Sequence, residues 1–290
     1  MNSLDGRIEA TEGGEAVAVR CLVKRDKEID LDVYTFDFTD RSSVTINVLS
    51  DLHIGNPLSD ERRIERYIQY VRESGNFLLL NGDLIECVTR TSKGDIYHLS
   101  ITSPDAQVDR VVELLAPVKD QILCITSGNH DLRSEGHDYS REIAYRLGVP
   151  HSPISALCIF RVGRKPKNGK PYVYTVYQTH GYGGGTSPGG QANAMDRFGR
   201  SIIANVVLIA HMHNAMISST TYLFPDLYNK GMTKVKQITV VTPSFMRYGG
   251  YAMRRGYRPP AQNMVEIILY GENRFNRWED KGTVEVKTIV

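Results

Sequence analysis

The sequence has few cysteines and no long apolar run. No two of its four cysteines form a CxxC pair, and they lie far apart at Cys21, Cys87, Cys124 and Cys158. This spacing argues against a zinc ribbon or a disulfide framework and fits a reducing compartment. The apolar runs NVVLIA and EIILY fall far short of the roughly 20 residues that a membrane-spanning helix needs. We therefore expect a protein that does not associate with a membrane.

The chain also lacks an excess of either charge. Its 35 basic and 33 acidic residues leave a formal net charge of +2, so the whole molecule has no strong field that would attract nucleic acid. Any basic surface must be local. The N-terminal segment MNSLDGRIEATEGGEA lacks the basic start and the apolar centre of a secretory signal, and we expect a cytoplasmic location.

What the sequence does contain is a repeating order of strand-like and helix-like segments. The segments VTINVLSD, NFLLLNGD and QILCITSGNHD predict strands. Amphipathic segments lie between them, and the second predicts a helix near residues 104–116 with Ser103 as N-cap and Pro104 at the first position. Strands that alternate with helices predict a layered α/β sheet.

A different pattern precedes and follows this repeating part. Residues 16–38 alternate apolar and polar positions around the polar break KRDKE, which predicts a β-hairpin. Further strands are predicted in YVYTVYQTHG, NVVLIAHMHN, VKQITVVTPSF, NMVEIILY and GTVEVKTIV, and a helix in ANAMDRFGRSIIA. We predict an N-terminal hairpin extension over residues 1–43 and a single catalytic domain over residues 44–290.

Metal-binding and proton-transfer side chains follow the five clearest strands. Open α/β sheets bind their ligands at the carboxyl ends of the strands, and residues two apart in a strand point to the same face. Taken alone, each of these residues is explained as well by an ordinary turn; the set as a whole is not. Its members are Asp51, His53, Asp83, Asn129, His130, Asp131, His180, His211 and His213.

The ordered pattern D-x-H, G-D, G-N-H-[DE], H and H-x-H over residues 51–213 resembles the signature of the calcineurin-like metallophosphoesterases. The resemblance implies a four-layer α/β/β/α sandwich with two metal ions at the strand ends. The family usually has Gly before its final H-x-H, where this chain has Ala210, and we expect only a small change in backbone fit. The ligands implied by position are Asp51, His53, Asp83 and His213 for one metal, and Asp83, Asn129, His180 and His211 for the other.

Mixed carboxylate, amide and imidazole donors suit two divalent metal ions. We expect manganese, with iron, zinc, nickel and magnesium as alternatives; such a pair activates water and clamps phosphate oxygens. His130 is expected to protonate the departing alkoxide or to stabilise the transition state. Asp131 is expected either to orient His130 or to cap a helix.

The residues within two of the motifs indicate the class of substrate. GDLIE and GNHD resemble the phosphodiesterase and Mre11-type nuclease branches of the family more than its protein phosphatases. The segment SFMRYGGYAMRRGYRPP interleaves arginine with tyrosine, a composition that binds phosphates and stacks bases, although a solvated surface loop explains it equally well. This segment resembles phage and prophage phosphoesterases, which implies the cytoplasm of a host cell. The expected substrate-binding residues are Arg247, Tyr248, Arg254, Arg255 and Arg258.

The sequence therefore predicts a binuclear metal-dependent phosphodiesterase acting on DNA, RNA, a cyclic nucleotide or another nucleotide-derived diester. One alternative is a phosphomonoesterase or protein phosphatase, and another is a non-catalytic scaffold with the same fold. The loop GYGGGTSPGG lacks the G-K-[ST] ending of a nucleotide-binding P-loop. Its glycines are expected to let the backbone pass close to the metals or to form a lip over the cleft.

Overall fold

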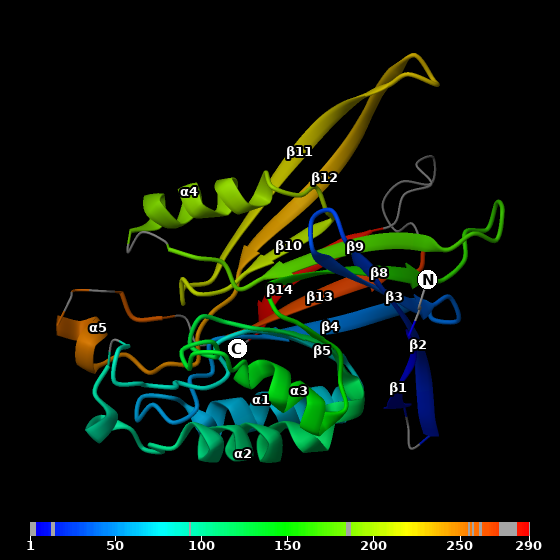
Figure 1. The fold of residues 1–290 in the computed structure, drawn as a ribbon. Helices are drawn as coiled ribbons and strands as arrows, with labels where there is room; N and C mark the ends of the chain where they lie inside the picture. Colours follow the sequence, from blue (N-terminus) through cyan, green and yellow to red (C-terminus); the bar gives the residue numbers. More distant parts are fainter. Residues whose placement is uncertain are drawn as a thin grey trace.

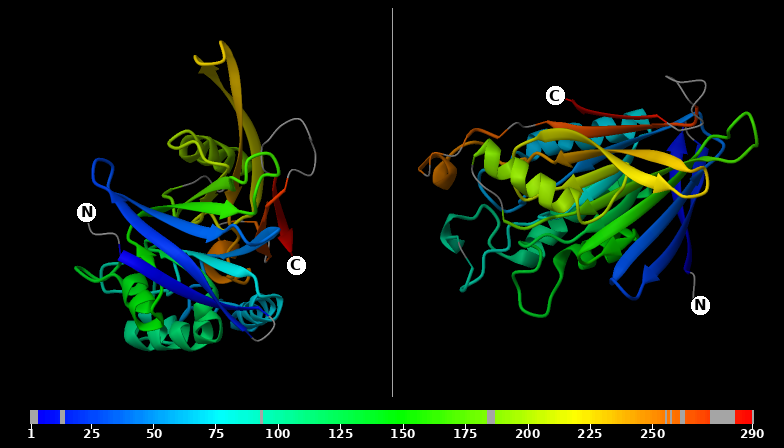
Figure 2. Two further views of the ribbon diagram at one scale, coloured as in Figure 1. Left: turned by 90° about the vertical axis from the view of Figure 1, so that its right-hand side faces the viewer. Right: turned by 90° about the horizontal axis from the view of Figure 1, so that it is seen from above.

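The computed structural model describes residues 4–12, 15–92, 94–183, 187–254, 256, 258–260, 263–272 and 283–289. Two β-sheets pack face to face, with helices on both outer faces (Figures 1 and 2). Helices α1, α2 and α3 cover one sheet, and α4 packs on the other. The predicted α/β/β/α sandwich is confirmed, with α4 as the helix of its fourth layer.

The six-stranded sheet is built around a parallel centre. Strands β4 to β7 run parallel to one another, whereas β13 pairs antiparallel with β4 and β14. Every residue of β5 and β6 is buried, because inner strands of such a sheet are covered on both faces. The order is β14 (Val284–Ile289), β13 (Met264–Tyr270), β4 (Ser43–Leu49), β5 (Phe77–Asn81), β6 (Ile122–Thr126) and β7 (His151–Ser152).

Side-chain caps begin the helices that cover this sheet. Asp60 caps α1 (Glu61–Ser74), Ser103 caps α2 (Pro104–Leu115) and Asp138 caps α3 (Tyr139–Leu147). Each cap oxygen accepts a hydrogen bond from an N–H group that the helix leaves unpaired. The prediction for α2 is therefore confirmed. Short 3₁₀ turns cover Ile96–His98 and Ala116–Gln121.

The eight-stranded sheet mixes parallel and antiparallel pairs. Strands β9, β10 and β12 are parallel, and β1 to β3 form an antiparallel meander that joins the sheet where β3 pairs with β8. The order is β1 (Leu4–Glu12), β2 (Glu15–Asp26), β3 (Leu31–Phe38), β8 (Ser155–Val162), β9 (Tyr172–Thr179), β10 (Val206–Ile209), β12 (Gly231–Val241) and β11 (Met216–Asp226). Helices α4 (Pro188–Gly199) and α5 (Gly250–Arg254) complete the fold.

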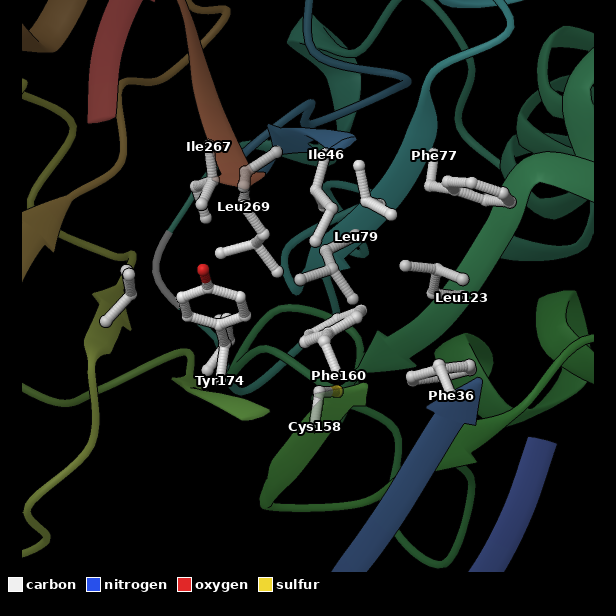
Figure 3. Close-up of a cluster of buried hydrophobic side chains, with 14 of the residues drawn as sticks. Phe36, Ile46, Phe77, Leu79, Leu123, Cys158, Phe160, Tyr174, Ile267 and Leu269 are labelled. Carbon is white, nitrogen blue, oxygen red and sulfur yellow. The ribbon is translucent and has the colours of Figure 1, made fainter. Parts of the chain in front are cut away.

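Large apolar side chains from both sheets fill the space between them (Figure 3). Phe36 and Phe160 stack with their ring centroids 5.3 Å apart, and they belong to the same buried cluster as Leu79 and Ile267 of the other sheet. Burial of each such side chain contributes about 1.5–3 kcal/mol. The predicted hairpin of β2 and β3 forms, but Phe36 makes it part of the main core. The domain boundary at residue 43 stays a prediction.

No helix among the described residues is long and apolar enough to cross a membrane.

Candidate metal centre

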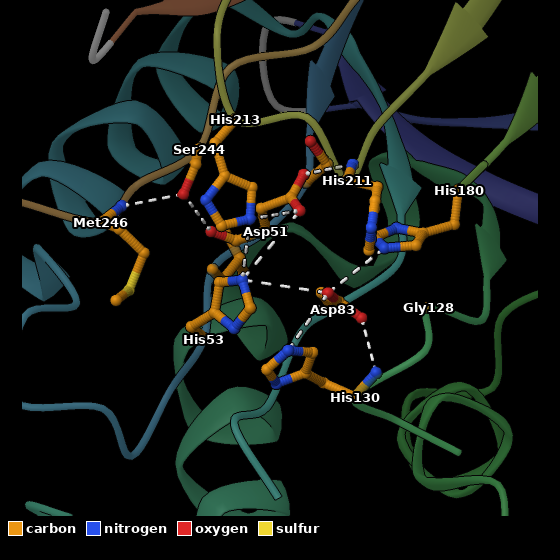
Figure 4. A network of polar contacts seen from close by, with 12 residues as sticks. Asp51, His53, Asp83, Gly128, His130, His180, His211, His213, Ser244 and Met246 are labelled. Carbon is orange, nitrogen blue, oxygen red and sulfur yellow. Dashed lines mark hydrogen bonds and ion pairs between the residues drawn. The ribbon is translucent and has the colours of Figure 1, made fainter. Parts of the chain in front are cut away.

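The predicted site residues meet at the carboxyl ends of strands from both sheets (Figure 4). Strands β4, β5 and β6 of one sheet end before Asp51, Asp83 and His130, and strands β9 and β10 of the other end before His180 and His211. The centre thus lies where the two sheets adjoin, so both layers are needed to assemble it.

Three clusters of potential ligands lie within this region. One contains Asp51, His53 and His213, a second His53, Asp83 and His130, and a third Asp83, His180 and His211; in each, the ligand atoms lie within 4.8 Å of one another. In the first, His213 Nε2 is 3.2 Å from Asp51 Oδ1 and 3.3 Å from His53 Nε2. In the third, His180 Nε2 is 3.2 Å from Asp83 Oδ2. Asp83 therefore stands between two groups of histidines.

Asn129 is the one predicted ligand that these clusters do not place. It lies in the turn that follows β6 and is exposed. Its assignment as a ligand stays a prediction.

The backbone at the centre is strained. Asp51, His53, Asp83, His211 and His213 all have positive φ, between 48° and 69°, a conformation that is uncommon for residues other than glycine. Such strain persists where the surrounding structure enforces it, and it gathers at functional sites. Here it turns the chain sharply at the strand ends, so that the side chains converge.

Two glycines of the motifs are required by close packing. A Cβ atom at Gly82 would lie 2.7 Å from His180 Nδ1, and one at Gly128 would lie 2.2 Å from Asp83 Oδ1. Any larger residue would push Asp83 or His180 out of place. Ala210, where the family has glycine, is buried and donates its N–H to the His180 carbonyl, so the chain accommodates it.

The donor atoms fit divalent cations. His211 Nδ1 is buried and has no hydrogen-bond partner, although an unpaired buried polar atom normally costs free energy. Asp51 and Asp83 are carboxylates with 0% and 1% exposure, and burying such charges requires a neutralising partner. Carboxylate oxygens and imidazole nitrogens are common ligands of divalent transition metals.

The pKa values describe the same charge balance. Burial opposes ionisation of Asp83, yet the imidazole of His180 and its neighbours holds the pKa of Asp83 well below its usual value. Burial also lowers the pKa of His180, but the Asp83 and Asp51 carboxylates outweigh it and raise that pKa to about 10. The lowered pKa of Asp83 and the raised pKa of His180 have the same cause, the close approach of the Asp83 carboxylate to the His180 ring.

His130 is fixed by groups that the motifs did not reveal. Its Nδ1 lies 2.8 Å from the Glu86 carbonyl oxygen, and its Nε2 lies 2.7 Å from a guanidinium nitrogen of Arg133. A carbonyl accepts and a guanidinium donates, so Nδ1 carries the proton and Nε2 has none. Burial and the nearby His53 lower the pKa of His130 to about 4. The ring is therefore neutral near pH 7.

The structure corrects the role expected of Asp131. Its buried carboxylate accepts hydrogen bonds from the backbone N–H groups of residues 83, 84, 85 and 128 and from the Ser140 hydroxyl. Burial and the Asp83 carboxylate raise the pKa of Asp131 to about 6. Asp138 caps the following helix. Asp131 thus neither orients His130 nor caps a helix; it holds together the loops that carry Asp83 and His130.

The expected substrate segment lies at the same end of the sandwich as the centre, around α5 (Figure 1). Arg247 donates to the Pro57 carbonyl oxygen and lines a cavity of about 540 Å³. Tyr248, Arg254 and Arg258 are exposed, and Arg255 lies outside the described residues.

The glycine-rich loop after His180 is described up to residue 183, and Ser187 to Gly190 begin α4. Residues 184–186 of GYGGGTSPGG lie outside the described residues, so the expected lip over the cleft stays a prediction.

The chain was compared with protein families, curated sequences and solved structures. No curated protein sequence matches the chain. Among solved structures, the phosphoesterase YfcE from E. coli is 16% identical, covering 78% of this chain and 92% of that chain with a TM-score of 0.41. Vps29 with bound Zn²⁺ from Entamoeba histolytica is 10% identical, covering 85% of this chain and 98% of that chain with a TM-score of 0.38. The family model for calcineurin-like phosphoesterases matches residues 44–215, more than half of the sequence and every strand end that carries the site, so the chain belongs to the calcineurin-like phosphoesterase family.

Proposed function

We propose that this phosphoesterase is a binuclear metal-dependent phosphodiesterase that hydrolyses nucleic acid or a nucleotide-derived diester. The observation that carries the proposal is the succession of Asp/His clusters that share His53 and Asp83. Asp51, His53 and His213 would hold one cation and His180 and His211 the other, with Asp83 between them and Asn129 completing the second set. We propose manganese as the metal, with iron, zinc, nickel and magnesium as alternatives.

When bound, the two cations supply the Lewis acidity that activates water and neutralises phosphate oxygens. The reaction forms a bond from the water oxygen to phosphorus and breaks the bond from phosphorus to one ester oxygen. The water proton leaves with the alcohol product, and a phosphomonoester remains. The protein must hold the phosphate in line and stabilise its developing charge.

His130 and Arg133 are suited to stabilising the charge that develops on the phosphate. The Arg133 side chain is only 16% exposed, and its other terminal nitrogen donates to the Glu86 carbonyl oxygen at 2.9 Å. His130 Nε2 lies 3.9 Å from Asp83 Oδ2, so the guanidinium that it holds is close to the proposed cation site. Because the neutral ring has no proton on Nε2, this arrangement favours stabilisation of the transition state over protonation of the alkoxide.

A cavity beside the centre supports a diester substrate. Asn56 lines this cavity and donates to Glu86 Oε2 at 3.1 Å, and Glu86 in turn contacts His53. Arg62 and Arg247 also line this cavity. Asp60 and Glu61 line the cavity as well, so the charges of its lining balance. A volume of about 540 Å³ is within the range of small-molecule sites, so the cavity offers room for the second ester substituent.

The experiment compares hydrolysis of bis-p-nitrophenyl phosphate with that of p-nitrophenyl phosphate in Mn²⁺. We expect faster cleavage of the diester, loss of metal and activity in Asp83→Asn, and a fall in kcat of about 10²–10³-fold with metal retained in His130→Ala. The matched control is His98→Ala, which removes an exposed histidine that contacts Asp95. If the monoester is cleaved faster, the protein is a phosphomonoesterase and not a phosphodiesterase. If metal-loaded protein cleaves neither substrate, the non-catalytic scaffold is favoured.

A further inference from the structure

The β11–β12 hairpin projects from the sandwich as a long arm (Figures 1 and 2). The two strands pair along their full length, from Met216 opposite Val241 to Asp226 opposite Gly231. The inner half of β12 is buried in the sheet, whereas the outer half is largely exposed. The order of the sheet ends at β11, so no described strand pairs with the outer edge of the arm.

This edge lacks the usual protection against pairing. An exposed edge strand offers unpaired N–H and C=O groups to any other strand, and proteins normally block it with charged residues or proline. The stretch from Met216 to Pro225, MISSTTYLFP, contains no charged residue, and proline comes only at its end. Eight of the eleven residues of β11 are exposed, and the other three are half-buried. The edge is therefore open to another strand over most of its length.

The sequence of β11 is complementary to itself when it is reversed. Small residues fill the first half of the central stretch, Ser218, Ser219 and Thr220, and large ones fill the second half, Tyr222, Leu223 and Phe224. If two copies run antiparallel with Thr221 opposite Thr221, each small residue faces a large one. Directly opposite residues are the pairs that stabilise a sheet.

We propose that two copies of this chain associate through their β11 strands, antiparallel, about a two-fold axis at Thr221. The contact is isologous, as in most soluble homodimers, and it joins the two eight-stranded sheets into one. No like charges meet, because Met216 faces the Asp226 of the second copy and the residues between are uncharged. The inference is independent of the proposed reaction.

The register also places the tip of each arm. Leu227 and Tyr228 form the exposed turn of the hairpin, with 89% and 93% of their surfaces accessible. Beyond the Met216 of the second copy the chain leads back within three residues to His213. Each tip therefore lies next to the segment that carries His211 and His213 in the other copy, which gives these two exposed apolar residues a partner surface.

Sedimentation equilibrium tests the association. We expect a mass twice the 32.6 kDa of the chain, and a single-chain mass for Thr221→Lys, which sets two like charges directly opposite each other. The matched control, Val173→Lys, adds the same charge at an exposed position of the inner strand β9 and should remain a dimer. A cooperative thermal unfolding transition in Thr221→Lys would show that this variant is folded. A monomeric wild type at about 100 µM, or a dimeric Thr221→Lys, would overturn the proposal.

Cross-linking tests the register. All four native cysteines are buried, so an engineered cysteine on β11 is the accessible thiol. Thr221→Cys should form an intermolecular disulfide, because directly opposite residues lie within disulfide range. Ser219→Cys should not form one, since the two copies of residue 219 would be about 13 Å apart. Equal cross-linking of both variants would contradict the register.

The rival partner of the arm is nucleic acid, which is suggested by Lys230, Lys234 and Lys236 on the same hairpin. If the protein is a monomer that binds DNA only when the arm is intact, nucleic acid replaces the second copy as the partner.

Discussion

The carboxylate of Glu86 lies 3.0 Å from Nδ1 of His53, with Glu86 Oε2 as the contacting atom. The same oxygen accepts a hydrogen bond from Asn56. Burial lowers the pKa of the His53 ring, but Glu86 together with the Asp83 and Asp51 carboxylates outweighs burial and raises that pKa to about 9. Because Nδ1 is held in this way, Nε2 of His53 is left free for the cluster with Asp51 and His213. Glu86 is therefore a positioning residue of the proposed metal site.

Glu86→Gln should weaken metal binding. The amide keeps the size of the side chain but removes the charge that fixes the ring and its basicity, and loss of such an outer partner typically costs 10–100-fold in metal affinity. Titration of the metal-free protein with Mn²⁺ measures the change. Glu113→Gln removes a surface carboxylate that pairs with Arg110 and should bind Mn²⁺ like the wild type. If the two variants bind equally, Glu86 has no part in the site.

Removal of metal should lower thermal stability. A ligand that binds only the folded state adds about 2.7 kcal/mol when its concentration is 100 times its Kd, which shifts Tm by several degrees. Melting curves in EDTA and in Mn²⁺ measure the shift. The shift should be absent in Asp83→Asn, which changes the residue common to two of the clusters. An equal shift in that variant would place the bound ion elsewhere.

The site was predictable from sequence to the extent that its residues occupy strand ends. Asp51, Asp83, His180 and His211 each follow a short apolar strand, and the sheet topology then brings them together without further information. The supporting residues carry no such signal. Glu86 stands three residues after Asp83 in GDLIE, and Arg133 three residues after His130, in positions that only the loop geometry turns toward the site.

The fold was predictable where one pattern dominates a segment, as for α2, whose N-cap Ser103 precedes Pro104. It was not predictable where tertiary contacts decide. Strand β8 pairs in parallel with β3, which lies more than a hundred residues earlier in the sequence. No local sequence pattern indicates that β8 pairs with this strand. Helix α3 follows the turn-rich stretch DLRSEGHD, which masks its cap at Asp138. The exposed β11 strand lacks the apolar face by which strands are found.

Gly128→Ala should disrupt the centre. The added Cβ would lie 2.2 Å from both the backbone nitrogen and Oδ1 of Asp83, so Asp83 or its loop must move, at a cost of about 1–3 kcal/mol. We expect a lower Tm together with loss of the Mn²⁺-dependent stabilisation. Gly189→Ala is the matched control, because a Cβ there has no atom within 4 Å. Wild-type metal binding in Gly128→Ala would show that Asp83 tolerates displacement.

Asp138→Asn should lower stability at neutral pH and have less effect in acid. Asp138 accepts a hydrogen bond from Ser127 Oγ at 2.8 Å, lies 3.4 Å from His151 Nε2 and caps α3. Burial opposes ionisation of Asp138, but His151 and Ser127 hold its pKa below the usual value. A carboxyl group whose pKa is lower in the folded protein contributes stability above its unfolded value of about 3.9, and loses it as the pH falls through the folded value. Urea unfolding should therefore show that the free energy of unfolding of the variant is about 1–3 kcal/mol lower than that of the wild type at pH 7. This difference should become smaller below pH 4.

Asp109→Asn is the control, at an exposed residue that pairs with Arg146. Its free energy of unfolding should differ little from that of the wild type at either pH. A gap for Asp138→Asn that widens in acid would mean that the protonated carboxyl is the stabilising form. Because Ser127 directly precedes Gly128, loss of this contact should also loosen the loop that presents His130.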